Sequence, residues 1–420
     1  MPRVSPNLVM PADAVADASG KGRGALVLLL VVVFINIAGF SLILPLLPFY
    51  GQAFHASAFE VTSLFAAYSF GNVFGEIYWG RASDRIGRKR VLTIAIGCAA
   101  LSYVAFAFAP TLWVALLIRV VTGFFSGTLG VAQSYIADVT LPKDRARSMG
   151  YFGAAFNLGF AIGPAIGGLL AQPELGLAGF HRPILAAAAL AGAASLWAAI
   201  SLKDTRVPGE MRPLPKYEEA FRFVAANPLL LRLFLLAFIT IGAFASMEAV
   251  FGLWTEHNFG WSAREVGLTF IAVGATGVAV QLFLIGPMVK HFGEARTIVA
   301  GLSLIGISMI LQPLVRDATA AAILMSTLMG GHSLAFPNVG ALLSRATPLE
   351  GRGSVLGLQM SSNALSRIIA PPLFGFVYAA IGPDWPYFLC TLLVAGAVLV
   401  ALQAVRLRDA QLSAEEGVTA

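Results

Sequence analysis

Charged residues are scarce in this sequence. Of its 420 residues, 12% are charged and 58% are hydrophobic, and the mean hydropathy is +0.79. A soluble globular domain carries about a quarter charged residues. The composition therefore excludes a soluble globular domain and indicates a chain whose main solvent is the lipid bilayer.

The residues that several chemistries require are also missing. The sequence holds no G-x-x-x-x-G-K-[ST] loop for nucleotide phosphates and no pair of histidines at zinc-binding spacing. Its two cysteines, Cys98 and Cys390, lie in separate apolar segments, where a free thiol usually packs as a small hydrophobic group. We therefore expect no cofactor, no metal site and no enzymatic activity, ATP hydrolysis included.

Long apolar runs are abundant instead. A hydrocarbon core about 30 Å thick needs about 20 apolar residues per helix. Runs of this length occur first at residues 25–50, 61–79, 91–109, 112–138, 149–171 and 183–202. A second set occurs at residues 228–254, 266–289, 297–315, 318–343, 354–381 and 387–405. The sequence therefore predicts an all-α membrane protein with twelve transmembrane helices.

The lysines and arginines between these runs indicate the orientation, because loops that stay in the cytoplasm carry the excess of them. One side holds Arg81, Arg85, Arg88, Lys89, Arg90, Lys143, Arg145 and Arg147, and the other holds Arg182, Arg264 and Arg316. We therefore predict a multi-pass inner-membrane protein with both termini in the cytoplasm. Since topology accounts for the net charge of +6, no nucleic-acid partner is needed.

A polar stretch at residues 203–227 divides the chain near its middle. Within it, Tyr217, Ala220, Phe221 and Val224 follow the spacing of one helical face. This pattern favours a helix along the membrane surface, and a solvated linker helix is the alternative. The predicted organisation is a cytoplasmic tail (1–24), a six-helix bundle (25–202), a cytoplasmic linker with its amphipathic helix (203–227), a second six-helix bundle (228–405) and a cytoplasmic tail (406–420).

The two predicted bundles repeat one another in sequence. Identical residues recur at a constant offset of 207 positions, in the pairs Gly123/Gly330, Thr140/Thr347, Arg145/Arg352, Gly150/Gly357, Pro164/Pro371 and Gly168/Gly375. Parallel repeats of six spans are the layout of major facilitator transporters, whose substrate site lies between the halves near the membrane midplane. The repeat predicts this fold, with two pseudo-symmetric six-helix bundles.

The loop after the second apolar run resembles the signature of the major facilitator superfamily. That signature is a glycine, an aspartate four residues later, a second glycine and a basic cluster, here Gly80, Asp84, Arg85, Gly87, Arg88 and Lys89. The resemblance implies that Asp84 helps to lock the two halves on the cytoplasmic side, near the beginning of the eleventh helix. An ordinary positive loop with an incidental acid is the alternative. The copy in the second half keeps Gly286 and Gly293 but has Lys290 in place of the acid, so any lock there must differ.

Two further segments resemble motifs of the drug:proton exporters in this superfamily. The fifth run carries a glycine stripe with a proline, formed by Gly159, Gly163, Pro164, Gly167 and Gly168, which is similar to the antiporter motif; close helix packing alone is the alternative. In the fourth run, residues 119–123 resemble the membrane arginine motif of the same family. Residues 134–140 and 261–268 resemble its tetracycline-efflux branch.

The first run departs from that family, because Asn36 stands where such exporters commonly carry an aspartate. An amide takes up no proton in the physiological range, so another group must couple protons if coupling exists. The candidates for the cavity and for coupling are Asn36, Arg119, Gln133, Glu248, His332, Asn338 and Arg367. Glu248 could instead be a boundary residue, His332 a polar packing residue, and Arg367 a structural ion-pair partner.

The resemblance implies a monomeric secondary transporter that exports small amphipathic compounds, drugs and tetracycline-like molecules among them. Its partners would be the small-molecule substrate, protons and the lipid bilayer, and it would work by alternating access. An uptake carrier or facilitator for a polar metabolite without proton coupling, and a membrane receptor, are the alternatives. An importer would be expected to lack the glycine pattern of the fifth run, and a receptor would be expected to lose the loop signature.

Overall fold

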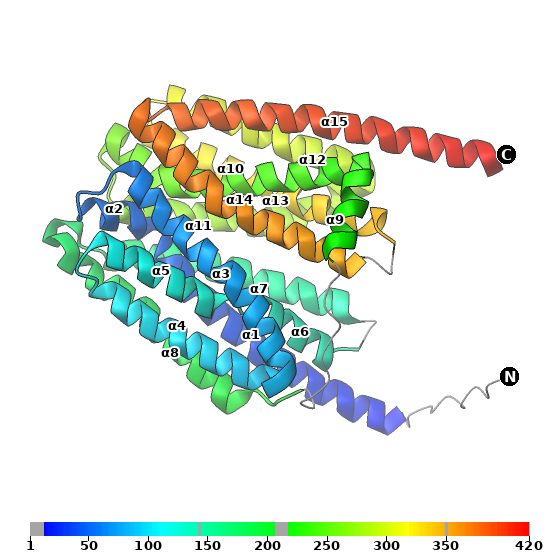
Figure 1. Cartoon of the computed structure of the whole chain (residues 1–420), viewed down its shortest axis with the longest axis horizontal. Helices are drawn as coiled ribbons and strands as arrows, with labels where there is room; N and C mark the ends of the chain where they lie inside the picture. Colours follow the sequence, from blue (N-terminus) through cyan, green and yellow to red (C-terminus); the bar gives the residue numbers. More distant parts are fainter. Residues whose placement is uncertain (1–11, 142–143, 206–216, 349–351, 420) are drawn as a thin grey trace.

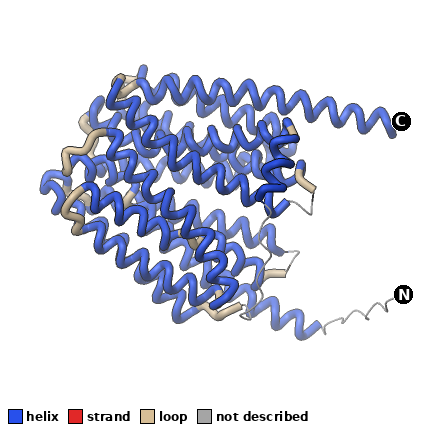
Figure 2. Tube along the Cα trace, viewed as in Figure 1, coloured by secondary structure: helices blue, strands red, loops and turns tan. Residues whose placement is uncertain are grey.

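The structure is a computed structural model that describes residues 12–141, 144–205, 217–348 and 352–419. Its regular elements in these ranges are helices, as Figure 2 shows. Helices are the expected form in lipid, because each backbone N–H and C=O group must be bonded within its own segment. The predicted all-α membrane architecture is therefore confirmed.

The helices follow one another with short connections. Those of the first part are α1 (Ala12–Leu42), α2 (Leu47–Gln52), α3 (Ala58–Ile86), α4 (Arg88–Ala107), α5 (Leu112–Ser126), α6 (Leu129–Val139), α7 (Arg145–Leu170) and α8 (His181–Ser201). Those of the second part are α9 (Tyr217–Ala226), α10 (Pro228–Phe259), α11 (Ala263–Ala279), α12 (Ile285–Leu311), α13 (Ala318–Ala346), α14 (Arg352–Ala380) and α15 (Trp385–Thr419). A π-helix, Val280–Leu284, joins α11 to α12.

Each predicted apolar run falls within these helices, but several are interrupted. A 3₁₀ turn at Leu44–Leu46 separates α1 from α2, and Gly127 separates α5 from α6. The eighth and ninth runs meet within α12, at Gly293, whose φ of 78° breaks the regular helix. Glycine suits this conformation because it has no Cβ to clash.

The number of membrane crossings is only partly settled by length and composition. Within the described ranges, nine helical stretches are long and apolar enough to cross a bilayer, and one of them, Ala263–Leu314, covers two predicted runs. The second and eleventh runs lie in α3 and α14, which have 29 residues each but fall outside these nine. Both helices carry charged residues within their length, so the count of twelve stays a prediction.

The helices gather into two bundles, one from α1 to α8 and one from α10 to α15 (Figure 1). The beginning of α1 and the end of α15 lie at the same end of the molecule, and we call this the terminal end. Both predicted tails overlap helices. α1 begins at Ala12, within the predicted tail 1–24, and α15 continues to Thr419, within the predicted tail 406–420. The boundaries of the bundles stay predictions.

The helix α9 lies in the predicted linker and packs against α10 and α14. Its Ala220 and Val224 are buried, whereas Phe221 is exposed on another side. The predicted helical face therefore packs partly against the second bundle. Residues 206–216 of the linker lie outside the described part of the chain.

Two helix pairs join the bundles: α3 with α14, and α7 with α11. Both pairs are in backbone contact at the end away from the termini. A Cβ on Gly375 of α14 would lie 2.6 Å from the carbonyl oxygen of Ala58, and a Cβ on Gly168 of α7 would lie 2.6 Å from that of Ala263. Toward the terminal end, the helices of the two bundles diverge (Figure 1). The halves are thus closed at one end through backbone contacts.

These contacts predict different effects for two glycines of α7. Gly163 faces α1 of its own bundle, where a Cβ would lie 2.8 Å from the Leu42 nitrogen. Overpacking a bundle costs about 1–3 kcal/mol, so Gly163→Ala should lower the melting temperature in detergent. Gly168 faces α11 of the other bundle, so Gly168→Ala should instead open the closed end. A cysteine at Gln52 should then react faster with a membrane-impermeant maleimide.

Gly150 provides the matched control on the same helix, since a Cβ there would meet nothing within 4 Å. Gly150→Ala should leave both the melting temperature and the maleimide reaction as in wild type. If Gly168→Ala lowered stability as much as Gly163→Ala without changing the reaction rate, the assignment of Gly168 to a movable contact would be wrong.

Candidate functional site

The loop signature forms a tight turn between α3 and α4. Gly87 has a φ of 97°, a conformation that side chains with a Cβ rarely adopt, and it ends α3. A Cβ at Gly87 would also collide with the carboxylate of Asp204. The Lys89 backbone N–H donates to the same carboxylate at 3.3 Å. Glycine is therefore required here both by conformation and by space.

Arg88 is the centre of this turn. It is 1% exposed, and its guanidinium forms an ion pair with Asp138 at the end of α6. It also donates to the Ser83 hydroxyl at 3.2 Å and lies 3.8 Å from the Asp84 carboxylate. Arg88 thus ties α3, α4 and α6 together. The role of Asp84 at the beginning of the eleventh span stays a prediction.

The second bundle holds an equivalent arrangement with the charges exchanged. Gly293 has a positive φ like Gly87, and the next residue, Glu294, is 3% exposed. Its carboxylate pairs with Arg345 at the end of α13, at 3.0 Å. Glu294 and Arg345 stand 206 and 207 positions after Arg88 and Asp138. The copy therefore keeps an ion pair with one buried member, but here the buried group is the carboxylate and its partner Arg345 is exposed.

The glycines of the stripe lie on two faces of α7, and each face packs against a different helix. Gly159, Gly163 and Gly167 lie against the backbone of α1, and the Ser41 hydroxyl of α1 donates to the Gly159 carbonyl at 3.1 Å. Gly168 lies on the other face, where a Cβ would be 3.1 Å from the Gly267 Cα in the opposite bundle. A Cβ on Gly267 would in turn lie 2.5 Å from the Pro164 carbonyl. The stripe therefore serves packing within one bundle and contact between the two.

Arg119 occupies the interior of the first bundle. It is 1% exposed, its Nε donates to the Leu64 carbonyl at 3.2 Å, and its Nη1 has no hydrogen-bond partner among the described residues. The guanidinium lies 4.7 Å from the ring centre of Tyr68, which stacks on Phe40 at 4.7 Å. The attraction between the guanidinium and the aromatic face offsets part of the free-energy cost of burying the charge.

The second bundle presents an aromatic stack at the facing position. His332 of α13 stacks on Phe244 of α10 at 4.6 Å and on Phe336 at 5.5 Å. Its Nδ1 is buried and has no hydrogen-bond partner among the described residues. The same holds for Oε1 of Glu248, which lies one helical turn after Phe244 on α10. Buried polar atoms without a partner are uncommon in folded proteins, and a functional role is one of the explanations for them.

Arg367 of α14 lies within electrostatic reach of titratable groups in both bundles. Its charge acts on Glu248 and His332 of its own bundle and on Glu76 of α3 in the other. The residue that precedes Arg367 is Ser366, and its hydroxyl donates a hydrogen bond to the Phe238 carbonyl of α10 at 2.6 Å. This bond fixes α14 to α10 at this position. Among the predicted candidates, Glu248 and His332 thus lie within electrostatic reach of Arg367, but no ion pair joins Arg367 to Glu248 among the described residues.

The other predicted candidates lie elsewhere. Asn36 is half-buried on α1, Gln133 is exposed on α6, and Asn338 is 4% exposed and donates to the Leu334 carbonyl of its own helix at 2.7 Å. That last bond ties the Asn338 amide to its own helix, and its predicted role in the cavity stays a prediction. Among the described residues, no group of three His, Cys, Asp or Glu side chains is placed to hold a metal ion.

Several contacts were not predicted from the sequence. The charge of Arg367 on α14 acts on Glu76 of α3 in the other bundle. The side-chain amides of Asn157 and Gln281 form a hydrogen bond between the bundles, from α7 to the π-helix. At the closed end, Gln52 donates to the Glu256 carboxylate at 2.5 Å. Nothing in the spacing of these residues pairs them, because each partner comes from a distant helix.

The sequence of the chain is similar to a known protein family and to known proteins over most of its length. The sequence pattern of the Major Facilitator Superfamily matches residues 29–257 and 233–419. The chain is 31% identical over 396 residues to the class C tetracycline resistance protein of Escherichia coli, covering 92% of this chain and 97% of that protein. It is 25% identical to multidrug resistance protein 2 of Bacillus subtilis, covering 84% and 88%.

A solved structure shares the fold at low sequence identity. It is a bacterial homolog of the human lysosomal transporter Spinster, in an inward-facing and unoccupied conformation. The TM-score is 0.74 at 16% identity, over 93% of this chain and 97% of that one.

The geometry around Arg88 predicts an order of stability for two substitutions. Arg88→Gln removes the buried partner of Asp138, and breaking a buried ion pair costs about 3–5 kcal/mol, so this variant should melt far below wild type. Asp84 is farther from Arg88 and partly exposed, so Asp84→Asn should cost under about 1 kcal/mol. Thermal melting of both purified variants checks this order. Equal losses would mean that Asp84, and not Asp138, holds Arg88 in place.

Proposed function

The chain belongs to the Major Facilitator Superfamily, and on this premise we propose that it exports small amphipathic compounds in exchange for protons. The observation that carries the proposal is that each bundle places a cationic or titratable side chain against an aromatic ring, Arg119 over Tyr68 in one and His332 on Phe244 in the other. The names of the relatives support it, since they are tetracycline and multidrug resistance proteins. The substrates we infer are drug-like molecules, tetracyclines among them.

The walls of this region suit an amphipathic ligand. Each bundle contributes an aromatic stack, Phe40 with Tyr68 on one side and Phe244 with His332 on the other. Aromatic faces bind planar apolar groups, and a few polar side chains fix the orientation of a ligand. Arg367 and Glu248 are the polar groups that we assign to this task. One chain supplies all of them, which favours a monomer as the working unit.

Alternating access follows from the contacts between the bundles. They touch at the end away from the termini and diverge at the terminal end (Figure 1). The excess of Lys and Arg in the loops at the terminal end favours a cytoplasmic location for both termini. On this orientation the described conformation is closed to the outside. Rocking about the α3/α14 and α7/α11 pairs would close the cytoplasmic side and open the other.

Proton coupling is assigned to Glu248 and His332, because Asn36 cannot titrate. Both groups have a buried polar atom without a hydrogen-bond partner among the described residues, and both lie within reach of the Arg367 charge. When Glu248 is ionised it holds Arg367 within the second bundle. When Glu248 takes up a proton, Arg367 turns toward Glu76 of the first bundle. A proton thereby changes which bundle holds the cation.

A facilitator for a polar metabolite is the second candidate, and Asn36 favours it. An exporter of this type without the usual acid in α1 could move its substrate down a gradient with no proton exchange. The experiment below separates the two functions, because only the exporter uses a pH gradient.

Proteoliposomes with an imposed pH gradient test the proposal, with tetracycline as the probe. Wild type should accumulate tetracycline against its gradient and move protons in exchange. Glu248→Gln and His332→Gln should each keep tetracycline exchange but lose accumulation, because a neutral group carries no proton in exchange. Glu218→Gln makes the same chemical change on exposed α9 and should behave as wild type.

Three results would contradict parts of this assignment. Accumulation by both the Glu248 and His332 variants would show that another group carries the proton. A parallel loss of exchange and accumulation would give the two residues a structural role. Tetracycline exchange without proton movement in wild type would favour the facilitator.

A further inference from the structure

A pair of side-chain amides joins the two bundles on the side where α7 meets α11. The Nδ2 group of Asn157 donates a hydrogen bond to Oε1 of Gln281, which lies in the π-helix Val280–Leu284. The Gln281 amide rests on α7, since a Cβ on Gly153 would lie 3.4 Å from its Nε2 atom. Single turns of π-helix are rare and often occur at functional sites. The proton exchange assigned to Glu248 and His332 does not involve this pair.

The contacts of α11 with α7 nearer the closed end are made by small residues. A Cβ on Gly267 would lie 2.5 Å from the Pro164 carbonyl oxygen, and a Cβ on Gly274 would lie 2.6 Å from the Ala161 Cα. Gly267, Gly274 and Gln281 are spaced by seven residues and therefore share one face of α11. At the third of these positions, long polar side chains replace the glycine contact.

The sequence repeat gives Gln281 a counterpart in the first bundle. The capping serines Ser57 and Ser262, which precede α3 and α11, are 205 positions apart. The same offset relates Glu76 of α3 to Gln281. Glu76 senses the charge of Arg367 across the other helix pair that joins the bundles. The two bundles thus carry polar side chains at equivalent positions, charged on the α3/α14 side and neutral on the α7/α11 side.

The aromatic residues beside Asn157 face the space between the bundles. On α7, the exposed Leu158 and Ile162 mark the side that faces lipid. Successive residues are about 100° apart around a helix, so Phe156 and Phe160 lie on the opposite side, between the faces that contact α1 and α11. Their rings are stacked with centroids 6.2 Å apart. An aromatic wall therefore adjoins the amide pair.

The amide pair leaves hydrogen-bonding groups unused. A side-chain amide has a carbonyl acceptor and two N–H donors. Oδ1 of Asn157 and Nε2 of Gln281 form no hydrogen bond with another described residue, and Gln281 is exposed. Hydrocarbon offers no partner for such groups, so a polar ligand or water is their favoured neighbour. The pair thus presents an acceptor and a donor side by side, next to the aromatic wall.

We propose that Asn157 and Gln281 bind an uncharged group of the exported compound that carries a hydrogen-bond donor beside an acceptor, such as a primary carboxamide. The carbonyl of the ligand accepts from Nε2 of Gln281, and its N–H group donates to Oδ1 of Asn157. The rings attached to this group pack on Phe156 and Phe160. This inference rests on the proposed export and specifies the substrate class, which is planar compounds with a neutral donor–acceptor edge.

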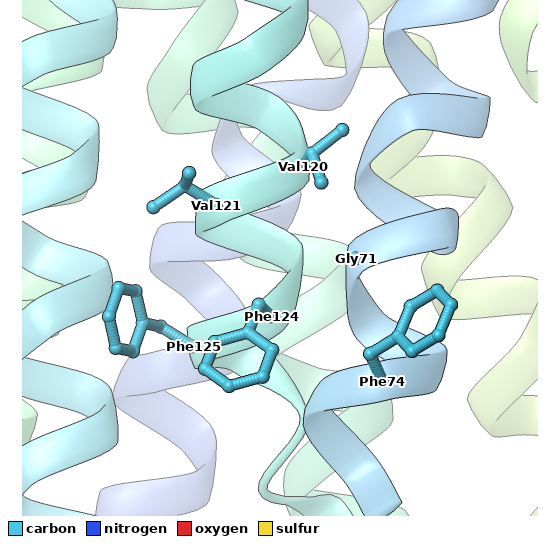
Figure 3. A pocket seen from close by; sticks show the side chains of 6 residues that line it. All are labelled: Gly71, Phe74, Val120, Val121, Phe124 and Phe125. Carbon is cyan, nitrogen blue, oxygen red and sulfur yellow. The ribbon is translucent and has the colours of Figure 1, made fainter. Parts of the chain in front are cut away.

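An apolar groove between α3 and α5 is a second place where a planar compound fits. Its volume is about 450 Å³, and it is lined by Gly71, Phe74, Val120, Val121, Phe124 and Phe125 (Figure 3). These side chains contain no hydrogen-bond donor or acceptor, so the groove cannot distinguish a carboxamide from another group of similar size. A preference for the carboxamide therefore identifies the amide site.

Equilibrium binding to the full chain, purified in detergent, tests the proposal. The probes are tetracycline, which carries a primary carboxamide, and its nitrile analogue, in which a cyano group replaces the carboxamide on the same rings. Wild type should bind tetracycline about fivefold more tightly, because the nitrile cannot donate a hydrogen bond. Gln281→Met and Asn157→Leu retain side-chain volume, and each should abolish this preference. Phe160→Leu should weaken both ligands by the same factor.

Two control variants should keep the preference of wild type. Asn258→Leu makes the same chemical change near the closed end, and Val121→Trp fills the apolar groove. Equal affinities of wild type for the two ligands would overturn the proposal. So would a parallel loss of both affinities with an unchanged ratio in the amide variants, which would make the pair a structural link between the bundles. A preference without proton-driven accumulation would support the site and contradict the proposed export, and accumulation without a preference would do the reverse.

Discussion

Close approach of helix backbones is the constraint on which this structure depends. Lipid tails are as apolar as the side chains of the helices, so apolar burial gives little force for association, and packing of small residues takes its place. The contacts of Gly163 with α1, of Gly71 with α5 and of Gly168 with α11 all follow this rule. Within a bundle these contacts fix the helices. Between the bundles they allow closure at one end without large interlocking side chains that would resist opening.

Charge follows a second rule, because an unpaired ion in lipid is costly. At the terminal end each bundle satisfies a buried charge internally, through Arg88 with Asp138 in one and Glu294 with Arg345 in the other. These pairs keep each bundle rigid and do not bind the bundles to each other. In the middle of the molecule, Glu248 and His332 keep buried atoms without a hydrogen-bond partner among the described residues, and His332 also stacks on Phe244. We place the working site there because buried polar atoms and aromatic rings occur together.

The sequence predicted the apolar runs, the repeat, the turn glycines and the glycine stripe, because each depends on local spacing or residue size. It did not predict which face of α7 meets which helix, and so it could not separate Gly163 from Gly168. It also missed the approach of Glu76 to Arg367 and the hydrogen bond from Asn157 to Gln281, since the partners are far apart in the chain. From the sequence, the change of charge in the second copy was visible only at Lys290, which replaces the acid of the loop signature. Arg345, which pairs with Glu294, lies at the end of another helix.

The inverted polarity has a consequence for how two similar bundles can move against each other. If both copies of the loop signature carried the same charges, the two surfaces at the terminal end would carry like groups in equivalent places, which would cost energy if they met. Here the first copy has Asp84 near the buried Arg88, and the second has Lys290 four residues before the buried Glu294. The backbone framework repeats, with positive φ at Gly87 and Gly293, while the side chains differ. The repeat thus keeps the geometry of the turn in both halves, while the charges at the two turns are opposite in sign.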